Sequence, residues 1–297
     1  MTLQHWFAIV WTSCVYCLFA VGLSIQLGVM RVLNVAHVSL YALGAIAGWW
    51  LVSEVELPLG VGFVGATLIG AVVGAVMYLL VFRPVASRTP RPEAGEANLI
   101  AGIGLSLVIT TLLLEATGGD DGSFPEGGLR GRVFAPVDGL RITGPQLTII
   151  LLTTVTVAGL MMVIRRTRAG RSMRAIAYDG EIAAAMGINV PRVSLLFFAV
   201  STALASLAGV MLGFARNEVH YSMGHELLLV GVAAVVVGGF GSVLGTALGS
   251  LAVSTAQVVA AVYLPSRFAP AVPFVLIVLM ILARPEGLFP IAKTESV

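Results

Sequence analysis

The sequence predicts an all-α fold, a polytopic transmembrane helical bundle. Hydrophobic residues make up 58% of the 297 residues and charged residues only 11%, against about 25% charged residues in soluble domains. Several windows of about twenty residues carry no charge, which is the length that an α-helix needs to cross a bilayer. The 34 glycines agree with this class, because small residues let helices approach closely in lipid. The sequence does not show the alternation of polar and apolar residues that a transmembrane β-barrel requires.

Apolar segments extend from one end of the chain to the other, so we predict one transmembrane domain over residues 1–297. The expected spans, about eight or nine in all, are Trp6–Leu27, Val38–Val52, Leu57–Phe82, Asn98–Ala116, Gln146–Ile164, Val193–Phe214, a broken segment within Leu227–Val262, and Pro273–Leu282 with its flanks. We expect a re-entrant break around Arg31–Ala36 and a second break at the glycines Gly238, Gly239 and Gly241, which disfavour a continuous helix. Arg31 is expected to reach the cytoplasmic interface with its long side chain.

The arginines concentrate in two polar loops, Arg83–Glu96 and Arg165–Arg192. Two predicted spans separate these loops, so both lie on one side of the membrane, and the positive-inside rule makes that side the cytoplasm. This topology places the N-terminus and the loop Thr117–Gly144 outside. The N-terminus has no basic region or cleavage site, so no removable signal peptide is expected.

Composition also limits the ligands and partners. The net charge is only +2 and the basic residues are scattered, which argues against a nucleic-acid partner. Cys14 and Cys17 have no second cysteine pair or histidine cluster beside them in the sequence, so we interpret them as small buried hydrophobes and expect no metal site.

The loop 165–192 contains the most informative segment, Asp179–Gly187. Asp179 is a good N-cap and Glu181 complements the helix dipole. The residues Ala183, Ala184, Ala185 and Met186 favour a helix, and Gly187 is a natural stop. The segment therefore predicts a helix of about two turns, which is too short to be stable alone. Two interpretations stay open at this point: the helix inserts into a groove of another protein, or it packs on the membrane domain of its own chain.

Four stretches resemble the permeases of branched-chain amino acid importers. They are Gly22–Ala45, Arg83–Arg88, Gly170–Val193 and Gly238–Gly249, and they occur in the order of that family. Within the third stretch, Glu181, Ala183 and Ala184, followed by Gly187, are similar to the EAA loop of ABC importer permeases. One departure is Val38, where the family usually has a glycine after the histidine.

The resemblance implies a non-catalytic permease subunit in a bacterial inner membrane, working by alternating access. Asp179, Glu181, Ala183, Ala184 and Gly187 would couple it to a cytoplasmic ATP-binding subunit. The other implied partners are a second, homologous permease and a periplasmic or lipid-anchored substrate-binding protein, with membrane lipid around them. No G-x-x-x-x-G-K-[ST] loop occurs in the sequence, so ATP would be bound by the partner subunit, and we expect no cofactor on this chain. The resemblance leaves the substrate open among branched-chain amino acids, other amino acids, urea and short amides.

Polar residues within apolar segments are candidates for the translocation path, because polar groups at membrane depth usually face an interior or a cavity. Asn34 and His37 would share one face if their segment is helical; they would line the path or hydrogen-bond across the turn. Gly239, Gly241 and Ser242 would offer backbone amides to a carboxylate, or would allow close helix packing. Ser106 would face the path, or bond to its own backbone.

Two other functions are considered. The first is a stand-alone secondary transporter or channel for a small polar solute such as urea or an amide. It would need acidic residues deep in a span for ion coupling, and the sequence has none there. The second is a membrane-embedded enzyme with His37 as acid or base, for which the sequence supplies no partner groups.

Overall fold

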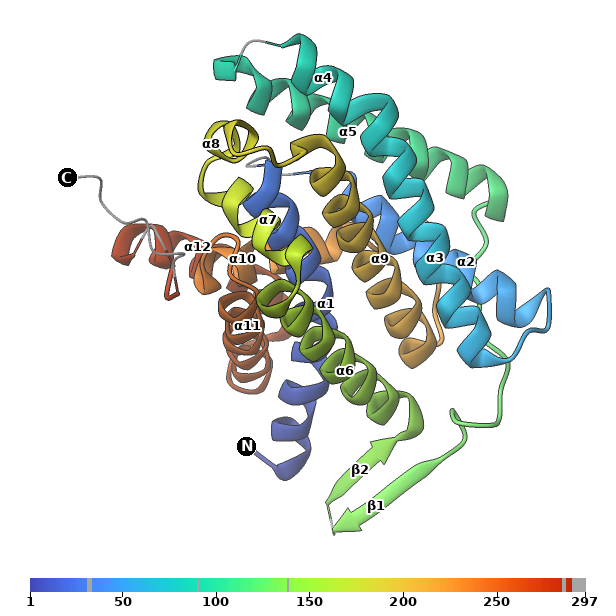
Figure 1. The fold of residues 1–297 in the computed structure, drawn as a ribbon. Helices are drawn as coiled ribbons and strands as arrows, with labels where there is room; N and C mark the ends of the chain where they lie inside the picture. Colours follow the sequence, from blue (N-terminus) through green and yellow to red (C-terminus); the bar gives the residue numbers. More distant parts are fainter. Residues whose placement is uncertain (31–33, 90, 138, 285–286, 290–297) are drawn as a thin grey trace.

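The structure is a computed structural model, and it describes residues 1–30, 34–89, 91–137, 139–284 and 287–289 (Figure 1). The elements are α1 (Leu3–Met30), α2 (His37–Ser53), α3 (Leu59–Met77), the π-helix η1 (Tyr78–Phe82), α4 (Arg83–Arg88), α5 (Arg91–Thr117), β1 (Val133–Val137), β2 (Leu140–Thr143), α6 (Gly144–Arg166), α7 (Arg168–Tyr178), α8 (Gly180–Ala185), α9 (Val190–Arg216), α10 (His225–Gly238), α11 (Val243–Tyr263), the 3₁₀ helix η2 (Ser266–Ala271) and α12 (Val272–Ala283). The predicted polytopic helical class is confirmed.

Within the part of the chain that the structure describes, six helical segments are long and apolar enough to cross a membrane, and three shorter apolar helices accompany them. The number of spans, predicted as eight or nine, therefore remains a prediction. Figure 1 shows α4, α7 and α8 at one end of the bundle and the N-terminus and the β1–β2 hairpin at the other end. This arrangement agrees with the sequence-based topology, in which both arginine-rich loops lie on one side.

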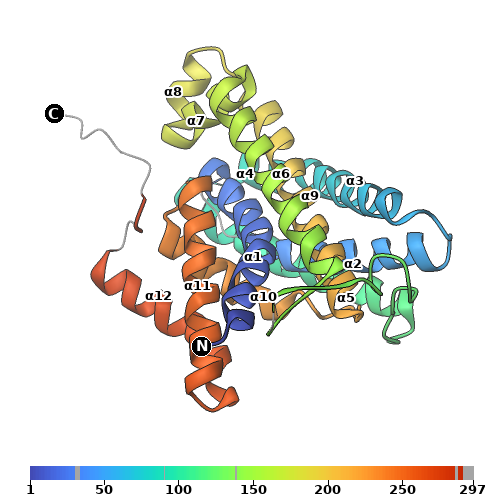
Figure 2. The same cartoon turned by 90° about the horizontal axis from the view of Figure 1, so that it is seen from below.

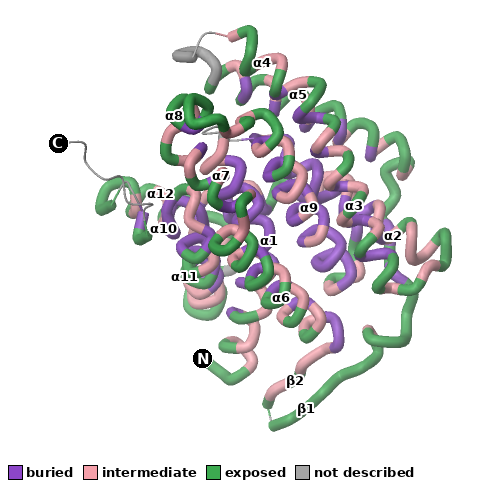
Figure 3. Tube along the Cα trace, in the orientation of Figure 1, coloured by how far each residue is buried: buried purple, intermediate pink, exposed green. Residues whose placement is uncertain are grey.

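The core forms around α1 and α9. Figure 3 shows the buried residues concentrated on these helices and on α10, and Figure 2 shows α11 and α12 on one side of α1 and α3 on the other. Hydroxyl groups on α9 tie it to its neighbours: Ser201 Oγ donates to the Gly22 carbonyl at 2.6 Å and Ser206 Oγ to the Leu40 carbonyl at 3.0 Å. Such bonds satisfy hydroxyls that lipid would leave without partners.

Glycines set the distance between α9 and the helices α2 and α3. A Cβ atom at Gly44 would overlap the Ser206 backbone, and one at Gly209 would overlap the Tyr41 carbonyl oxygen. On α3, a Cβ atom at Gly70 would overlap the side chain of Ser206. The backbones therefore approach as closely as small residues permit, which is how helices associate in lipid.

The polar loop predicted at Arg83–Glu96 is largely helical, so that prediction was wrong. The helix of α3 continues through η1 and α4 as far as Arg88, and α5 begins at Arg91. Pro84 does not end the helix, because it follows the π-helical turn and lies in the first turn of α4, where its missing N–H costs little. Pro84 therefore does not indicate an irregular loop.

The loop Thr117–Gly144 contains the antiparallel hairpin of β1 and β2, which the sequence analysis did not predict. The hairpin is joined to the start of α1 by two hydrogen bonds. Gln4 Nε2 donates to the Arg141 carbonyl at 3.1 Å, and the Arg141 N–H donates to Gln4 Oε1 at 2.9 Å. These bonds hold the hairpin against the N-terminal end of the bundle.

Candidate coupling surface and membrane breaks

The segment Asp179–Gly187 has the capped helix that the sequence predicts. Asp179 Oδ1 accepts from the N–H groups of Glu181 at 2.8 Å and Ile182 at 3.0 Å. At the other end Gly187 adopts φ +84° and its N–H donates to the Ala184 carbonyl at 2.9 Å. Both ends of this short helix are thus fixed by local hydrogen bonds, which compensates for its small number of internal bonds.

Most of α8 faces away from the rest of the chain. Ile182 is 55% exposed and Met186 is 77% exposed, and one helical turn separates them, so they share a face. Among the residues expected to couple, Ala184 and Gly187 are exposed and Ala183 is 2% exposed. Ala183 therefore packs inward, while an apolar face of α8 is left open to another molecule.

The arginine-rich segment before α8 forms the amphipathic helix α7, which the sequence analysis missed. The Thr167 side chain caps α7 by accepting from the Gly170 N–H at 3.1 Å. Two apolar residues of α7, Met173 and Ile176, are buried against the rest of the chain. Its apolar residues at helical spacing among arginines were the signal that would have identified it. Arg174 Nη1 donates to the Ile164 carbonyl at the end of α6, so α7 is attached firmly to the membrane helix that precedes it.

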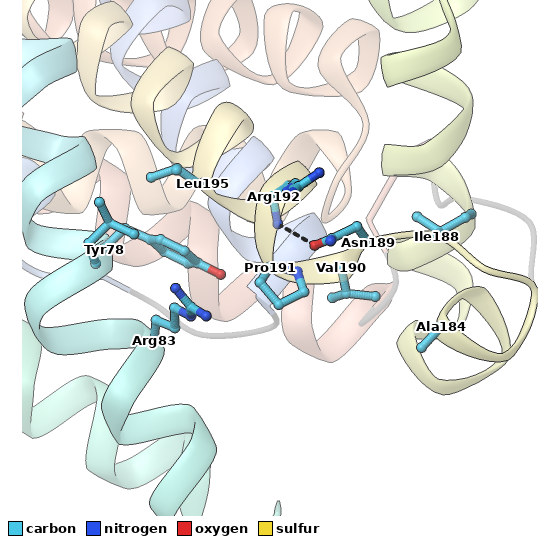
Figure 4. A pocket seen from close by; sticks show the side chains of 10 residues that line it. Tyr78, Arg83, Ala184, Ile188, Asn189, Val190, Pro191, Arg192 and Leu195 are labelled. Atoms are coloured by element: carbon cyan, nitrogen blue, oxygen red, sulfur yellow. Dashed lines mark hydrogen bonds between the residues drawn. The ribbon is translucent and has the colours of Figure 1, made fainter.

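A cavity of about 530 Å³ opens beside α8 (Figure 4). Its lining comes from three places in the chain: η1 and the start of α4, the end of α8, and the first turns of α9. The lining residues are Tyr78, Leu79, Arg83, Ala184, Ile188, Asn189, Val190, Pro191, Arg192 and Leu195. Sequence reasoning did not find this cavity, because nothing in the local pattern brings Tyr78 and Arg83 next to residues 189–195.

The first membrane break lies between α1 and α2. Residues 31–33, including Arg31, lie outside the described residues. Asn34 is buried in the turn before α2, where its Oδ1 accepts from the Ala36 N–H at 3.0 Å. A Cβ atom at Gly102 on α5 would lie 3.1 Å from the same oxygen. Asn34 thus closes the turn with its side chain and lies against α5.

His37 begins α2 and is completely buried. Its Nε2 lies 3.2 Å from the Phe19 carbonyl, and its ring lies 4.9 Å from the Phe19 ring, centroid to centroid. The sequence analysis placed Asn34 and His37 on one face only if their segment is helical, and Asn34 precedes the helix. The Asn34 side chain lies against α5, and the His37 side chain contacts α1.

We expect His37→Ala to destabilise the protein more than it slows transport. The substitution removes a ring enclosed by α1, and large-to-small changes in a core cost about 3–5 kcal/mol for aromatic residues. Thermal unfolding of the purified protein and uptake per folded molecule would separate the two effects. The exposed His225 supplies the control, because His225→Ala should change neither. A stable His37→Ala protein that has lost uptake would instead place His37 on the translocation path.

The second break lies between α10 and α11, as predicted. Gly239 and Gly241 adopt φ +101° and +76°, which side chains other than glycine rarely tolerate. Ser242 caps α11 by accepting from the Gly245 N–H at 3.1 Å. The last carbonyls of α10, Val237 and Gly238, accept from the N–H groups of residues 288 and 289 at 3.0 and 3.2 Å. Much of the hydrogen-bonding capacity at this break is therefore used within the chain.

The structure brings this break close to the coupling loop. A cavity of about 290 Å³ is lined by Gly28 on α1, by residues of α6 and α7 that include Arg165 and Met173, and by residues 241–244 at the break. Ser106, in contrast, is buried on α5, the helix that lies against Asn34. The predicted path residues therefore form two separate groups. Ser106 lies on α5 and Asn34 lies against that helix, whereas Gly241 and Ser242 share a cavity with residues of α7.

The broken apolar helices and the exposed helix at one end of the bundle define a multi-pass membrane protein of the transport-permease class. A family model described as branched-chain amino acid transport system / permease component matches residues 6–283, so the chain belongs to this family. It is a permease subunit of the ABC importer type, and its relatives are non-catalytic transport components.

Curated relatives agree with this assignment over almost the whole chain. The high-affinity branched-chain amino acid transport system permease protein LivH of Salmonella typhimurium is 28% identical, covering 99% of this chain and 97% of LivH. BraD of Pseudomonas aeruginosa, which bears the same description, is 27% identical over 95% of this chain and 94% of BraD. The fructose import permease protein FruG of Bifidobacterium longum is 30% identical over 62% of this chain and 55% of FruG. Among solved structures, PsaBC from Streptococcus pneumoniae in complex with Fab matches with a TM-score of 0.44 at 13% identity, covering 96% of this chain and 93% of that chain.

Proposed function

We propose that this chain forms part of the translocation path of an ATP-driven importer and that α8 is its coupling helix. The observation that carries the proposal is the form of α8: a helix of two turns, capped at both ends, which leaves Ile182 and Met186 exposed. A short apolar helix face of this kind suits a groove on a partner protein. The partner would be a cytoplasmic ATP-binding subunit, which would place α8 inside the cell and the N-terminus outside.

The proposed mechanism is alternating access. ATP-driven closure of the partner subunits would move α8 and the attached α7, and the cavity shared by Met173 and Gly241 connects α7 to the break between α10 and α11. A second, homologous permease would supply the other wall of the path, and a substrate-binding protein would deliver the solute from outside. Asn34, Ser106, Gly239, Gly241 and Ser242 are proposed to border the path, while His37 braces α1 against α2.

The proposed substrate is a branched-chain amino acid or a related small polar solute. LivH and BraD are described as branched-chain amino acid permeases, which supports this choice. FruG, a fructose import permease, shows that similar sequences accompany a different solute. Binding assays on the cognate substrate-binding protein would decide between an amino acid and another polar solute.

We expect Ile182→Asp together with Met186→Asp to weaken association with the ATP-binding subunit at least tenfold. The few residues that dominate an interface cost about 2 kcal/mol or more each when they are truncated, and a buried aspartate would add a desolvation cost. Co-purification of the assembled transporter and ATP-driven uptake into proteoliposomes would measure the loss.

Leu129→Asp is a matched control, because Leu129 is a 43% exposed leucine in the loop at the opposite end of the bundle. It should leave association unchanged. Uptake that continues without any ATP-binding subunit, and that ignores the double substitution, would contradict the proposal in favour of a stand-alone transporter. Glu181→Lys gives an independent test of α8.

A further inference from the structure

The cavity beside α8 has the chemistry of an anion site. We call it the arginine pocket, lined by Tyr78, Arg83, Asn189, Arg192 and Leu195 among the residues given above. Figure 4 shows Arg83 beside the Tyr78 hydroxyl on one wall and Asn189 and Arg192 on the facing wall. The volume of about 530 Å³ falls within the range of about 300–1,000 Å³ typical of small-molecule sites.

No residue that the structure describes neutralises the positive charge of the arginine pocket. No carboxylate occurs among its lining residues, and neither Arg83 nor Arg192 forms an ion pair with any residue that the structure describes. Asn189 Oδ1 accepts from the Arg192 N–H at 3.2 Å, which leaves the amide group of Asn189 as a further donor. The first turn of α9 also begins here and adds the positive end of its dipole to the two guanidinium groups.

The arginine pocket lies where the apolar surface of the bundle gives way to arginines. The segment Leu59–Arg88 passes from apolar residues into α4 at this point. Leu79, which lines the pocket, is 42% exposed, and the neighbouring Leu80 is 71% exposed. The π-helical turn η1 presents Tyr78 and Leu79 together, and such turns are frequent at functional sites. A ligand that fits must therefore have an anionic group next to an apolar chain.

We propose that the arginine pocket binds the phosphate of an anionic phospholipid, such as phosphatidylglycerol, with its acyl chains along Leu79 and Leu80. Basic pockets between membrane helices on the cytoplasmic side recognise such headgroups. A free phosphate would leave the leucine wall without a ligand, and an acidic protein loop would not account for the exposed leucines. The inference rests on the proposed function in one respect only, which is that the arginine pocket lies on the cytoplasmic side of the membrane. The lipid would join η1 to the link between α8 and α9, and would thereby help to hold the coupling helix in place.

The test uses the full-length chain in nanodiscs that contain phosphatidylcholine with or without phosphatidylglycerol. Retained phosphatidylglycerol is measured by native mass spectrometry, and the unfolding temperature is recorded in both lipids. Arg83→Gln with Arg192→Gln should reduce the retained lipid about tenfold or more, since each basic residue contributes to headgroup attraction. Arg88→Gln is the matched control: it removes an exposed arginine of the same helix that does not line the pocket, and it should retain the lipid.

The other outcomes are also decisive. If inorganic phosphate raises the unfolding temperature in phosphatidylcholine nanodiscs as much as phosphatidylglycerol does, the ligand is a soluble anion and the lipid proposal is overturned. It is also overturned if the Gln pair retains the lipid but no longer co-purifies with the ATP-binding subunit, because the pocket would then belong to that interface. Arg83→Lys with Arg192→Lys guards against misfolding, since it should restore lipid retention. Failure of the proposed coupling role would appear separately, as normal lipid retention with no effect of substitutions at Ile182 and Met186.

Discussion

Gly209→Leu is expected to abolish recovery of the folded protein. A Cβ atom at Gly209 would overlap the Tyr41 carbonyl oxygen and would lie 2.8 Å from its carbonyl carbon and 3.2 Å from the Ala45 nitrogen. These are backbone atoms of α2, so no side chain can rotate away, and α9 would have to separate from α2. Overpacking costs about 1–3 kcal/mol when side chains can adjust. A clash with backbone should reach or exceed the top of that range, out of a total stability of about 5–15 kcal/mol.

Size-exclusion chromatography of the detergent-solubilised protein measures this effect as the yield of monodisperse material. Gly159→Leu on α6 is the control, because a Cβ atom at Gly159 has no atom within 4 Å, and its yield should match the parent protein. Equal yields from the two variants would show that α2 and α9 do not approach as closely as described. Gly209→Ala should give an intermediate yield, since it adds one carbon atom at the same contact.

Gly187→Val is expected to reduce ATP-driven uptake about tenfold without lowering the yield of folded protein. Gly187 adopts φ +84°, and a non-glycine residue pays about 1–3 kcal/mol in such a conformation. Nothing lies within 4 Å of a Cβ atom at this position, so the penalty comes from the backbone and not from a clash. Relief of the strain would break the hydrogen bond from the Gly187 N–H to the Ala184 carbonyl and unwind the last turn of α8.

Gly180 offers a control within the same helix. It is the first residue of α8, a Cβ atom added there would have no other atom within 4 Å, and its φ is not positive. Gly180→Ala should therefore leave uptake unchanged or raise it slightly, because alanine favours the helix by about 1 kcal/mol. Uptake by Gly187→Val at the level of the parent protein would show that the end of α8 plays no part in coupling.

The elements that the sequence predicted well are those determined by neighbouring residues. The cap at Asp179, the stop at Gly187 and the break at Gly239 and Gly241 all follow from local hydrogen bonds and backbone dihedral angles. The hairpin of β1 and β2 was missed because β1 is exposed throughout and shows no alternation of polar and apolar side chains, and β2 is only four residues long. The segment after Phe82 was predicted as a loop because it contains prolines and arginines, although residues 83–88 continue the preceding helix as α4.

The candidate sites also divide into those determined by neighbouring residues and those determined by contacts between distant parts of the chain. The position of α8 on the same side as the other arginine-rich segment, Arg83–Glu96, followed from span length and charge, and the structure places α8 and α4 at the same end of the bundle (Figure 1). The arginine pocket did not follow, since Tyr78 and Arg192 are more than a hundred residues apart in the sequence. The role of His37 also depended on a distant residue, because only packing shows that its ring lies against Phe19.

By itself the sequence determined that this is a helical membrane protein with two broken segments and a short capped helix within a charged loop, because hydrophobic length, charge and glycine positions act locally. Only the tertiary structure decided which faces of these helices are covered. It buried Ala183 and His37, left Ile182 and Met186 exposed, and brought η1 beside the start of α9. The physical reason is that burial depends on contacts between helices distant in sequence, and in lipid those contacts are set by the fit of small residues such as Gly44 and Gly209.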